Sequence, residues 1–319
     1  MSGTTNFVEA QASNRRNTLV LLAILTAIAA VFGYLIGWAL EDEARDQLTA
    51  VSSAGVALAA LMAAVSIGWS LLSLTFGNRI VLSMADAKPI EKADAPQLYN
   101  VVEEMSLAAG VPMPKVMVME TDALNAFATG TSTTNAVIVV TRGLLGALNR
   151  DELQGVVAHE MGHIANLDTR YMTVVGVTVG LIALVADMIL RMLNWGSFNR
   201  GSSNDRKGGG GGAILLIIVL IVAAILAPLA AKAVQMAVSR QREYLADATS
   251  VQFTRNPAGL ISALTKIDAV AKPFPGVSNA TQHLFIVNPV QSLKARVPAL
   301  LATHPEVADR IARLRNPGG

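Results

Sequence analysis

The chain has 319 residues, of which 52% are hydrophobic and only 15% are charged, and its mean hydropathy is positive. This composition is unusual for a soluble protein and indicates that the chain contains membrane segments. The net charge is +2 and the basic residues are scattered, so no nucleic-acid partner is expected. The absence of cysteine excludes disulfides, thiol nucleophiles and thiolate metal sites.

Two long apolar runs near the start predict a membrane hairpin. A polar tail, residues 1–17, precedes runs at 18–40 and about 50–76, each long enough to cross a bilayer. A cleaved signal peptide is the alternative for the first run, but this run is longer than a typical signal core and lacks a good cleavage site. Basic residues flank the hairpin and its linker is acidic, so both ends are expected in the cytoplasm.

Residues 77–170 have the composition of a soluble domain. Asp94-Ala95-Pro96 predicts the start of a helix that runs to Ala109, and short strands are expected at 115–120 and 136–141. Between these strands, a polar and apolar alternation predicts an exposed edge strand that can pair with an extended substrate. Its residues are Asn125, Ala126, Phe127, Ala128 and Thr129. An ordinary sheet strand is the alternative.

An HExxH motif occupies residues 159–163, on an expected helix from Asp151, its predicted N-cap, to Arg170. His159 and His163 lie four residues apart on such a helix and therefore share one face, where both imidazoles can bind one zinc ion. Glu160 can then act as the general base towards a water activated by the metal. Chance is the alternative, because the motif fixes only three positions.

A second hydrophobic hairpin is predicted from runs at about 171–193 and 213–231, joined by a glycine-rich loop at 195–212. Asp187 interrupts the third run and Pro228 the fourth. A buried or partly inserted hairpin is therefore the alternative to two full spans.

A third zinc ligand must come from His, Asp or Glu, and the remaining histidines are His283 and His304. Glu243 and Asp247 offer an acidic alternative, since they are four residues apart on an expected helix and can face one site. Glu243 would complete the ligand set, and Asp247 would accept the free ring N–H of a ligand histidine. A solvated charged helix is the alternative interpretation.

Taken together, the motifs resemble those of the HtpX-type membrane-bound zinc metalloproteases, relatives of the CAAX prenyl proteases. The matching segments are HEMGH with the following Asn-Leu-Asp168, SRQREYLAD, NAFATG, HLFIVNP and THPEVADRIARL. They occur in the family's order and cover nearly the whole chain from residue 18. The departures are Glu306, where relatives commonly have a second proline, and the glycine-rich loop; neither touches the expected metal site.

The resemblance implies one Zn²⁺ per chain and a defined set of site residues. The zinc ligands are His159, His163 and Glu243, and the general base is Glu160. The first candidate for stabilising the oxyanion is His304, and Arg310 and His283 are the next candidates. The implied fold is α+β and mainly helical: a gluzincin-like zinc metalloprotease domain with a small β-sheet, formed by 77–170 and 232–319, plus about four transmembrane helices.

The implied function is that of a zinc endopeptidase in the bacterial cytoplasmic (inner) membrane, multi-pass, with the catalytic domain and both termini in the cytoplasm. Misfolded or damaged membrane proteins and unfolded polypeptides are the expected substrates, in quality control and stress response. The oligomeric state is left open.

Three other functions fit less well. An intramembrane zinc protease would need the motif inside an apolar span, whereas charged residues flank it here. Prenylated-protein processing enzymes generally carry more membrane helices. A transporter or inactive metal-binding adaptor would need polar residues within the spans or a lost base, and Glu160 is present.

Overall fold

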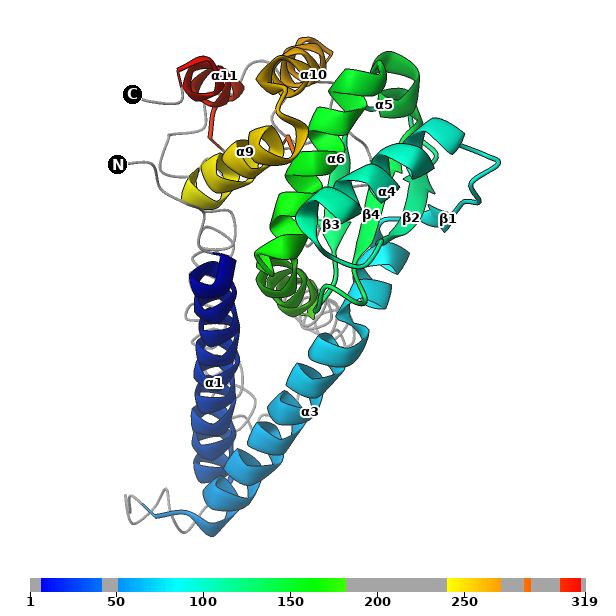
Figure 1. Ribbon diagram of the computed structural model, residues 1–319. Helices are drawn as coiled ribbons and strands as arrows, with labels where there is room; N and C mark the ends of the chain where they lie inside the picture. The colour runs from blue at the N-terminus through cyan, green and yellow to red at the C-terminus, as the bar shows by residue number, and fades with distance from the viewer. Residues whose placement is uncertain (1–6, 42–50, 182–239, 271–283, 288–304, 317–319) are drawn as a thin grey trace, which may run out of the picture. The chain divides into compact units, whose positions relative to one another are not determined.

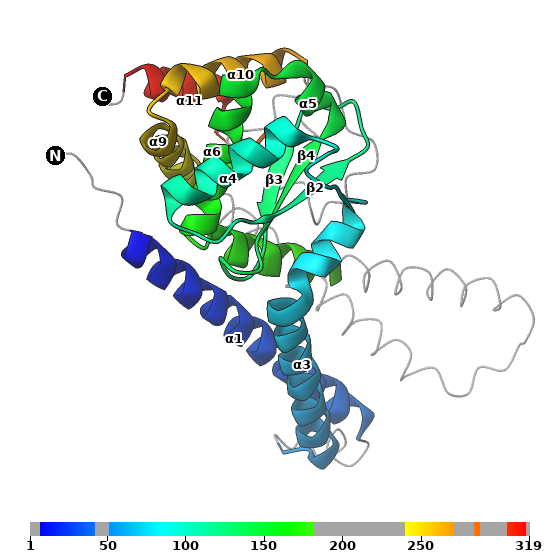
Figure 2. The same ribbon diagram turned by 45° about the vertical axis from the view of Figure 1, so that its right-hand side comes forward.

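The computed structural model describes residues 7–41, 51–181, 240–270, 284–287 and 305–316. The chain divides into two compact units (Figures 1 and 2). The first unit combines 1–18, 73–177 and 234–319, and the second combines 19–72 and 178–233.

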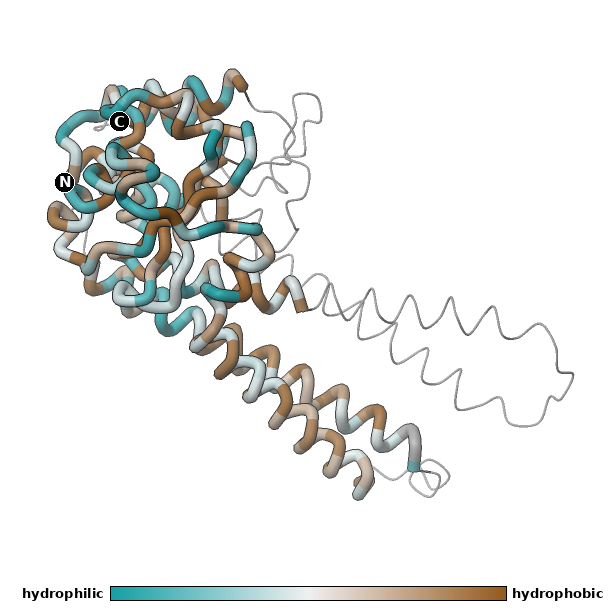
Figure 3. The backbone as a smooth tube through the Cα atoms, turned by 90° about the vertical axis from the view of Figure 1, so that its right-hand side faces the viewer, coloured by the Kyte–Doolittle hydropathy of each residue, from teal (hydrophilic) through white to brown (hydrophobic). Residues whose placement is uncertain are grey.

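The second unit contains most of two long helices, α1 (Phe7–Leu40) and α3 (Ser53–Met84). Among the described residues, two helical stretches are long and apolar enough to cross a membrane, Val8–Trp38 and Ser53–Met84. Hydrophobic residues dominate both helices in Figure 3. The predicted hairpin is therefore helical, although α1 begins before the predicted run and α3 continues past its predicted end.

Small residues let α1 and α3 pack closely. A Cβ added at Gly33 would collide with the backbone carbonyl of Leu58, and one added at Gly37 would collide with that of Ala54. Glycines four residues apart are a common device for close helix packing in membranes. Further along the same pair, the hydroxyls of Thr26 and Ser66 lie 3.1 Å apart and form a hydrogen bond.

The predicted third run begins within the described chain, where residues 168–181 are helical. The rest of that run, the predicted fourth run and the loop at 195–212 lie outside the described residues. Two candidate spans are thus present in the described part of the chain, and the expectation of about four transmembrane helices stays a prediction.

The first unit contains a mixed four-stranded sheet of order β1-β2-β4-β3. Its strands are β1 (Lys88–Pro89), β2 (Lys115–Met119), β3 (Ala126–Thr129) and β4 (Val137–Thr141). β2 and β4 are parallel, with Met117 opposite Val139, while β1 and β3 join antiparallel at the two edges. The three predicted strands are confirmed, as is a mainly helical α+β fold with a small sheet.

Helices pack against this sheet and against one another. They are α4 (Pro96–Ala109), α5 (Arg142–Ala147), α6 (Arg150–Ala165), α9 (Arg240–Thr254), α10 (Pro257–Ala269) and α11 (Val307–Arg315). α6 is buried on nearly all sides, because it contacts α4, α9, α10 and β3. Gly155 makes the close approach to α10 possible: a Cβ there would lie 2.7 Å from the backbone nitrogen of Leu260.

The ends of α6 differ from the prediction. Its N-cap is Asn149 rather than Asp151, because Asn149 and Glu152 form a capping box in which each side chain accepts the other's backbone N–H. The helix does not continue to Arg170. It ends at Ala165, and Leu167 adopts a φ of 58°, which breaks the helix before a new one begins at residue 168.

Candidate functional site

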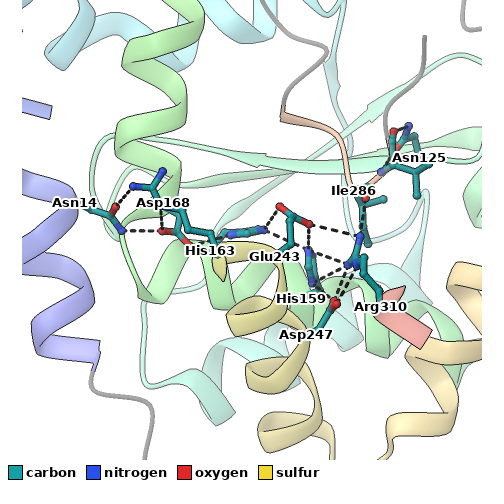
Figure 4. A network of polar contacts seen from close by, with 11 residues as sticks. Asn14, Asn125, His159, His163, Asp168, Glu243, Asp247, Ile286 and Arg310 are labelled. Atoms are coloured by element: carbon teal, nitrogen blue, oxygen red, sulfur yellow. Dashed lines mark hydrogen bonds and ion pairs between the residues drawn. The ribbon is translucent and has the colours of Figure 1, made fainter. Parts of the chain in front are cut away.

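α6 and the first turn of α9 bring three side chains to one point in the first unit (Figure 4). His159 Nε2 lies 3.2 Å from His163 Nε2, and each nitrogen lies 3.6 Å from a Glu243 carboxylate oxygen. The three side chains are nearly inaccessible to solvent, with 0%, 5% and 3% exposure respectively. The residues expected to form a ligand set therefore lie side by side, although 80 residues separate His163 from Glu243 in sequence.

A carboxylate behind each imidazole determines which ring nitrogen carries the proton. Asp247 Oδ1 lies 2.9 Å from His159 Nδ1, and Asp168 Oδ2 lies 3.0 Å from His163 Nδ1. Because a carboxylate only accepts, each Nδ1 carries a proton, and Nε2 is therefore the nitrogen of each ring that can bind a metal ion. Asp247 was expected in this role. Asp168 was not expected to accept from a ligand histidine, although its position just after the HExxH motif could have indicated this role.

This donor set fits a zinc ion. Three electron-pair donors that converge in a buried place repel one another unless a cation lies among them. Bonds of about 2.0–2.1 Å to a tetrahedral ion put neighbouring ligand atoms roughly 3.3–3.4 Å apart. The observed separations of 3.2 and 3.6 Å bracket that spacing, and two imidazoles with one carboxylate are ligands that zinc accepts.

Acidic neighbours raise the pKa of both histidines. Burial and the Arg310 charge lower the pKa of His159, but the hydrogen bonds to Asp247 and Glu243 together with the Asp247 charge outweigh them and raise it to about 9. Burial likewise lowers the pKa of His163, while the hydrogen bond to Asp168 raises it, with a net increase. Protons and a metal ion compete for the same nitrogen lone pairs, so metal binding by this site depends on pH.

Glu160 lies beside the ligands and is only 1% exposed. Its Oε1 atom has no hydrogen-bond partner among the described residues. Burial raises the pKa of this carboxyl group, and the nearby histidines oppose that effect. A carboxylate with a raised pKa is better matched to taking a proton near neutral pH than an exposed one.

Arg310, on α11, is fully buried behind the site with 1% exposure. Its guanidinium donates to both carboxylate oxygens of Asp247, at 2.9 and 2.6 Å, and to the Ile286 carbonyl, at 2.9 Å. Burial opposes the charged form of Asp247, but the Arg310 charge and the hydrogen bonds from His159 and Arg310 together outweigh it and lower the pKa of that carboxyl group. Arg310 therefore holds the carboxylate that orients His159.

The histidines proposed with Arg310 as oxyanion stabilisers, His304 and His283, lie outside the described residues. Their roles stay predictions. Arg310 itself donates to Asp247 and also lies beside the expected ligands, with Nη1 3.5 Å from Glu243 Oε2 and Nη2 3.3 Å from His159 Nδ1.

The segment 125–129 forms the predicted edge strand, but it is not exposed. All four β3 residues are buried, because residues 284–287 cover the start of the strand. The Ile286 N–H donates to the Ala126 carbonyl at 2.9 Å, the Asn125 side chain donates to the Val287 carbonyl at 2.8 Å, and the Phe127 and Phe285 rings meet edge to face. A substrate-binding role for Asn125 to Thr129 stays a prediction.

The N-terminal part of α1 reaches the same network, which the sequence did not indicate. Asn14 donates to Asp168 and accepts from Arg242 (Figure 4). From the sequence, residues 1–17 are predicted only as a polar tail.

A family model and sequence relatives show the family to which the chain belongs. The model of peptidase family M48 matches residues 92–318. Proteins named Protease HtpX homolog are 41% identical in Streptococcus agalactiae serotype III (strain NEM316) and 44% identical in Lactiplantibacillus plantarum (strain ATCC BAA-793 / NCIMB 8826 / WCFS1), each over 96% of this chain and 98% of the relative. The crystal structure of S. mikatae Ste24p is similar with a TM-score of 0.47 and 20% identity, covering 96% of this chain and 67% of that one.

Proposed function

The chain belongs to peptidase family M48 and is a membrane-bound metalloprotease, and from that premise we propose a more specific function. It is a zinc endopeptidase that hydrolyses peptide bonds of misfolded or damaged membrane proteins and of unfolded polypeptides. The observation that carries the proposal is the convergence of His159, His163 and Glu243, with both imidazoles oriented by carboxylates.

The residues of the chain divide the chemistry among them. When bound by the three ligands, a zinc ion would lower the pKa of water and polarise the substrate carbonyl. Glu160 takes the proton of the attacking water and delivers it to the leaving nitrogen, so the peptide bond is exchanged for a carboxylate and an amine. Asp247 and Asp168 keep the ligand histidines in the tautomer that presents Nε2. His304 is the proposed oxyanion stabiliser.

We place this activity at the cytoplasmic face of the bacterial inner membrane. The support is the pair of apolar helices and the basic residues that flank them, including Arg15 and Arg16 before the first apolar run and Lys88 after the second helix. The third and fourth apolar runs would add two further spans, so that both termini and the whole catalytic domain stay in the cytoplasm. Substrate segments next to the membrane would then reach the site.

The test pairs metal analysis with proteolysis on the purified full chain in detergent. The wild type should hold about one zinc per chain and cleave casein, and a zinc chelator should stop the cleavage. Glu160→Gln should keep the zinc but cleave on the order of 10²–10⁴-fold more slowly, which is the usual contribution of a general base. Undiminished cleavage by Glu160→Gln would exclude the proposed mechanism.

Two controls separate the ligands from the base. Glu243→Ala should lose zinc and activity together, and full zinc occupancy in this variant would remove Glu243 from the ligand set. Glu120→Gln changes an exposed carboxylate that pairs with Arg142, and it should leave both zinc content and cleavage unchanged.

A further inference from the structure

Asn14 occupies an unusual position for a residue on the helix that carries the first candidate span. It lies at the polar start of α1, yet it is 4% exposed and its side chain is buried among segments far away in sequence. Its Nδ2 donates to Asp168 Oδ1 at 2.7 Å and to the Asn166 carbonyl at 3.0 Å, and its Oδ1 accepts from Arg242 at 2.7 Å. One amide thus joins the end of the HExxH helix to the start of α9.

A single residue, Asp168, connects Asn14 to the expected metal ligand His163. Asp168 is 1% exposed, and its two carboxylate oxygens face different partners: Oδ2 meets His163 Nδ1 at 3.0 Å, while Oδ1 meets Asn14 at 2.7 Å (Figure 4). Arg242 also lies near Oδ1, with its Nε at 3.4 Å, so Asn14 and Arg242 together hold the carboxylate plane and with it the direction of the His163 ring; Asn14 makes the shorter contact. Arg242, the other partner of Asn14, directly precedes Glu243 in sequence.

The same face of α1 also completes the end of α6. The last carbonyls of a helix have no partner within it and need one from elsewhere. Gln11 Nε2 donates to the Ala165 carbonyl at 2.7 Å, and Asn14 donates to the next carbonyl, that of Asn166. Gln11 and Asn14 are one turn apart, so a single face of α1 caps the helix that carries both histidine ligands.

We propose that Asn14 is a positioning residue of the metal site, which sets the orientation of His163 through Asp168 and so raises the affinity for zinc. The inference rests on the proposed function, because it assumes that His163 binds zinc. Its consequence is that the helix carrying the first candidate membrane span is part of the catalytic machinery: displacing its polar start would weaken the metal site without touching a ligand.

The experiment measures the zinc dissociation constant by chelator competition on the purified full chain, in a Glu160→Gln background that prevents self-cleavage. Asn14→Ala should weaken zinc binding by about tenfold, at the lower end of the range for residues behind a ligand histidine. Asn14→Asp should weaken it further, because two carboxylates would then face each other. Asn17→Ala is the matched control: Asn17 lines the same cavity as Asn14 and makes no side-chain hydrogen bond within the described residues.

A reciprocal exchange keeps the test independent of folding defects. In the double variant Asn14→Asp with Asp168→Asn, the amide at position 168 can still accept from His163 and donate to the carboxylate at position 14. This variant should bind zinc more tightly than Asn14→Asp alone. Thermal unfolding of the metal-free proteins is measured in parallel, since a merely structural role would change the unfolding temperature and leave the dissociation constant alone.

The outcomes are distinct. Zinc binding by Asn14→Ala within about twofold of the Glu160→Gln parent, or equal binding by Asn14→Asp and the double variant, would overturn the positioning role while the proposed function stands. A parent protein that binds no zinc would overturn the proposed function first, and this inference with it.

Discussion

The buried pair of Arg310 and Asp247 controls how His159 is presented to a metal. Arg310 makes two hydrogen bonds to Asp247, which in turn accepts from His159. A bidentate contact of this kind fixes the carboxylate in one plane, which a lysine cannot reproduce. Because both charges are buried, removing one of them leaves the other uncompensated.

We therefore expect Arg310→Met to reduce the free energy of unfolding by about 3–5 kcal/mol, the usual result of removing one partner from a buried pair. The double variant Arg310→Met with Asp247→Asn should be more stable than Arg310→Met, because the carboxylate that Arg310 contacts most closely is then neutral as well. Thermal unfolding in detergent with a chelator present measures this without a contribution from bound metal. A double variant no more stable than Arg310→Met would contradict the assignment of the pair.

Among individual residues, the sequence allowed prediction of those that are grouped by their spacing within one short helical segment. Glu243 and Asp247 stand four apart on one helix, and His159 and His163 likewise, so chemistry and spacing were enough to group them. Arg310 carried a weaker signal, as a charge among the apolar positions Val307 and Leu314 of α11. Asn14 carried none, because its partners lie 152 to 228 residues away and only tertiary structure brings them together.

Among the elements, α6 depends on Glu152 at its start. The Glu152 carboxylate accepts from the Asn149 backbone at 2.8 Å, from Ser262 at 2.6 Å and from Lys266 at 2.8 Å. It thus caps α6 and ties it to α10. Burial raises the pKa of Glu152, but the hydrogen bonds from Lys266, Ser262 and Asn149 outweigh burial and lower it below its ordinary value of 4.5.

Glu152→Gln should therefore cost about 1–2 kcal/mol of unfolding free energy at pH 7, because the amide oxygen can still accept from the Asn149 N–H but the charged hydrogen bonds from Ser262 and Lys266 are lost. A lowered folded pKa means that the ionised form contributes stability above pH 4.5, and that this contribution is lost as pH falls through the folded pKa. The difference between wild type and variant should be constant near neutral pH and shrink below pH 4.5. Unfolding curves across pH 3–8 measure it, and a difference that grows at low pH would contradict the sign.

The sequence predicted most elements but misplaced some of their ends. Pro96 marked the start of α4 correctly, since proline suits the first helical position. The break after Ala165 was missed, because Leu167 adopts a positive φ that the sequence does not suggest for a bulky residue. That break matters functionally: it turns the chain so that Asp168 faces His163.

For the whole molecule, membrane topology is the feature on which substrate access depends. The absence of cysteine makes it directly measurable, since any introduced cysteine is the only thiol in the chain. We would compare Gln47→Cys in the first linker, Lys92→Cys before α4 and Ser202→Cys in the glycine-rich loop. The reagent is a membrane-impermeant maleimide, applied to intact cells with a permeable outer membrane and then to lysed cells.

Two full hairpins predict that Gln47→Cys and Ser202→Cys react in intact cells, while Lys92→Cys reacts only after lysis. The physical reason is the excess of basic residues outside the first hairpin, which holds those segments in the cytoplasm. If Ser202→Cys also needs lysis, the third and fourth runs do not span, and the two halves of the catalytic domain are joined by a hairpin on the cytoplasmic side. If Lys92→Cys reacts in intact cells, the HExxH helix is on the outer side and the proposed cytoplasmic substrates are excluded.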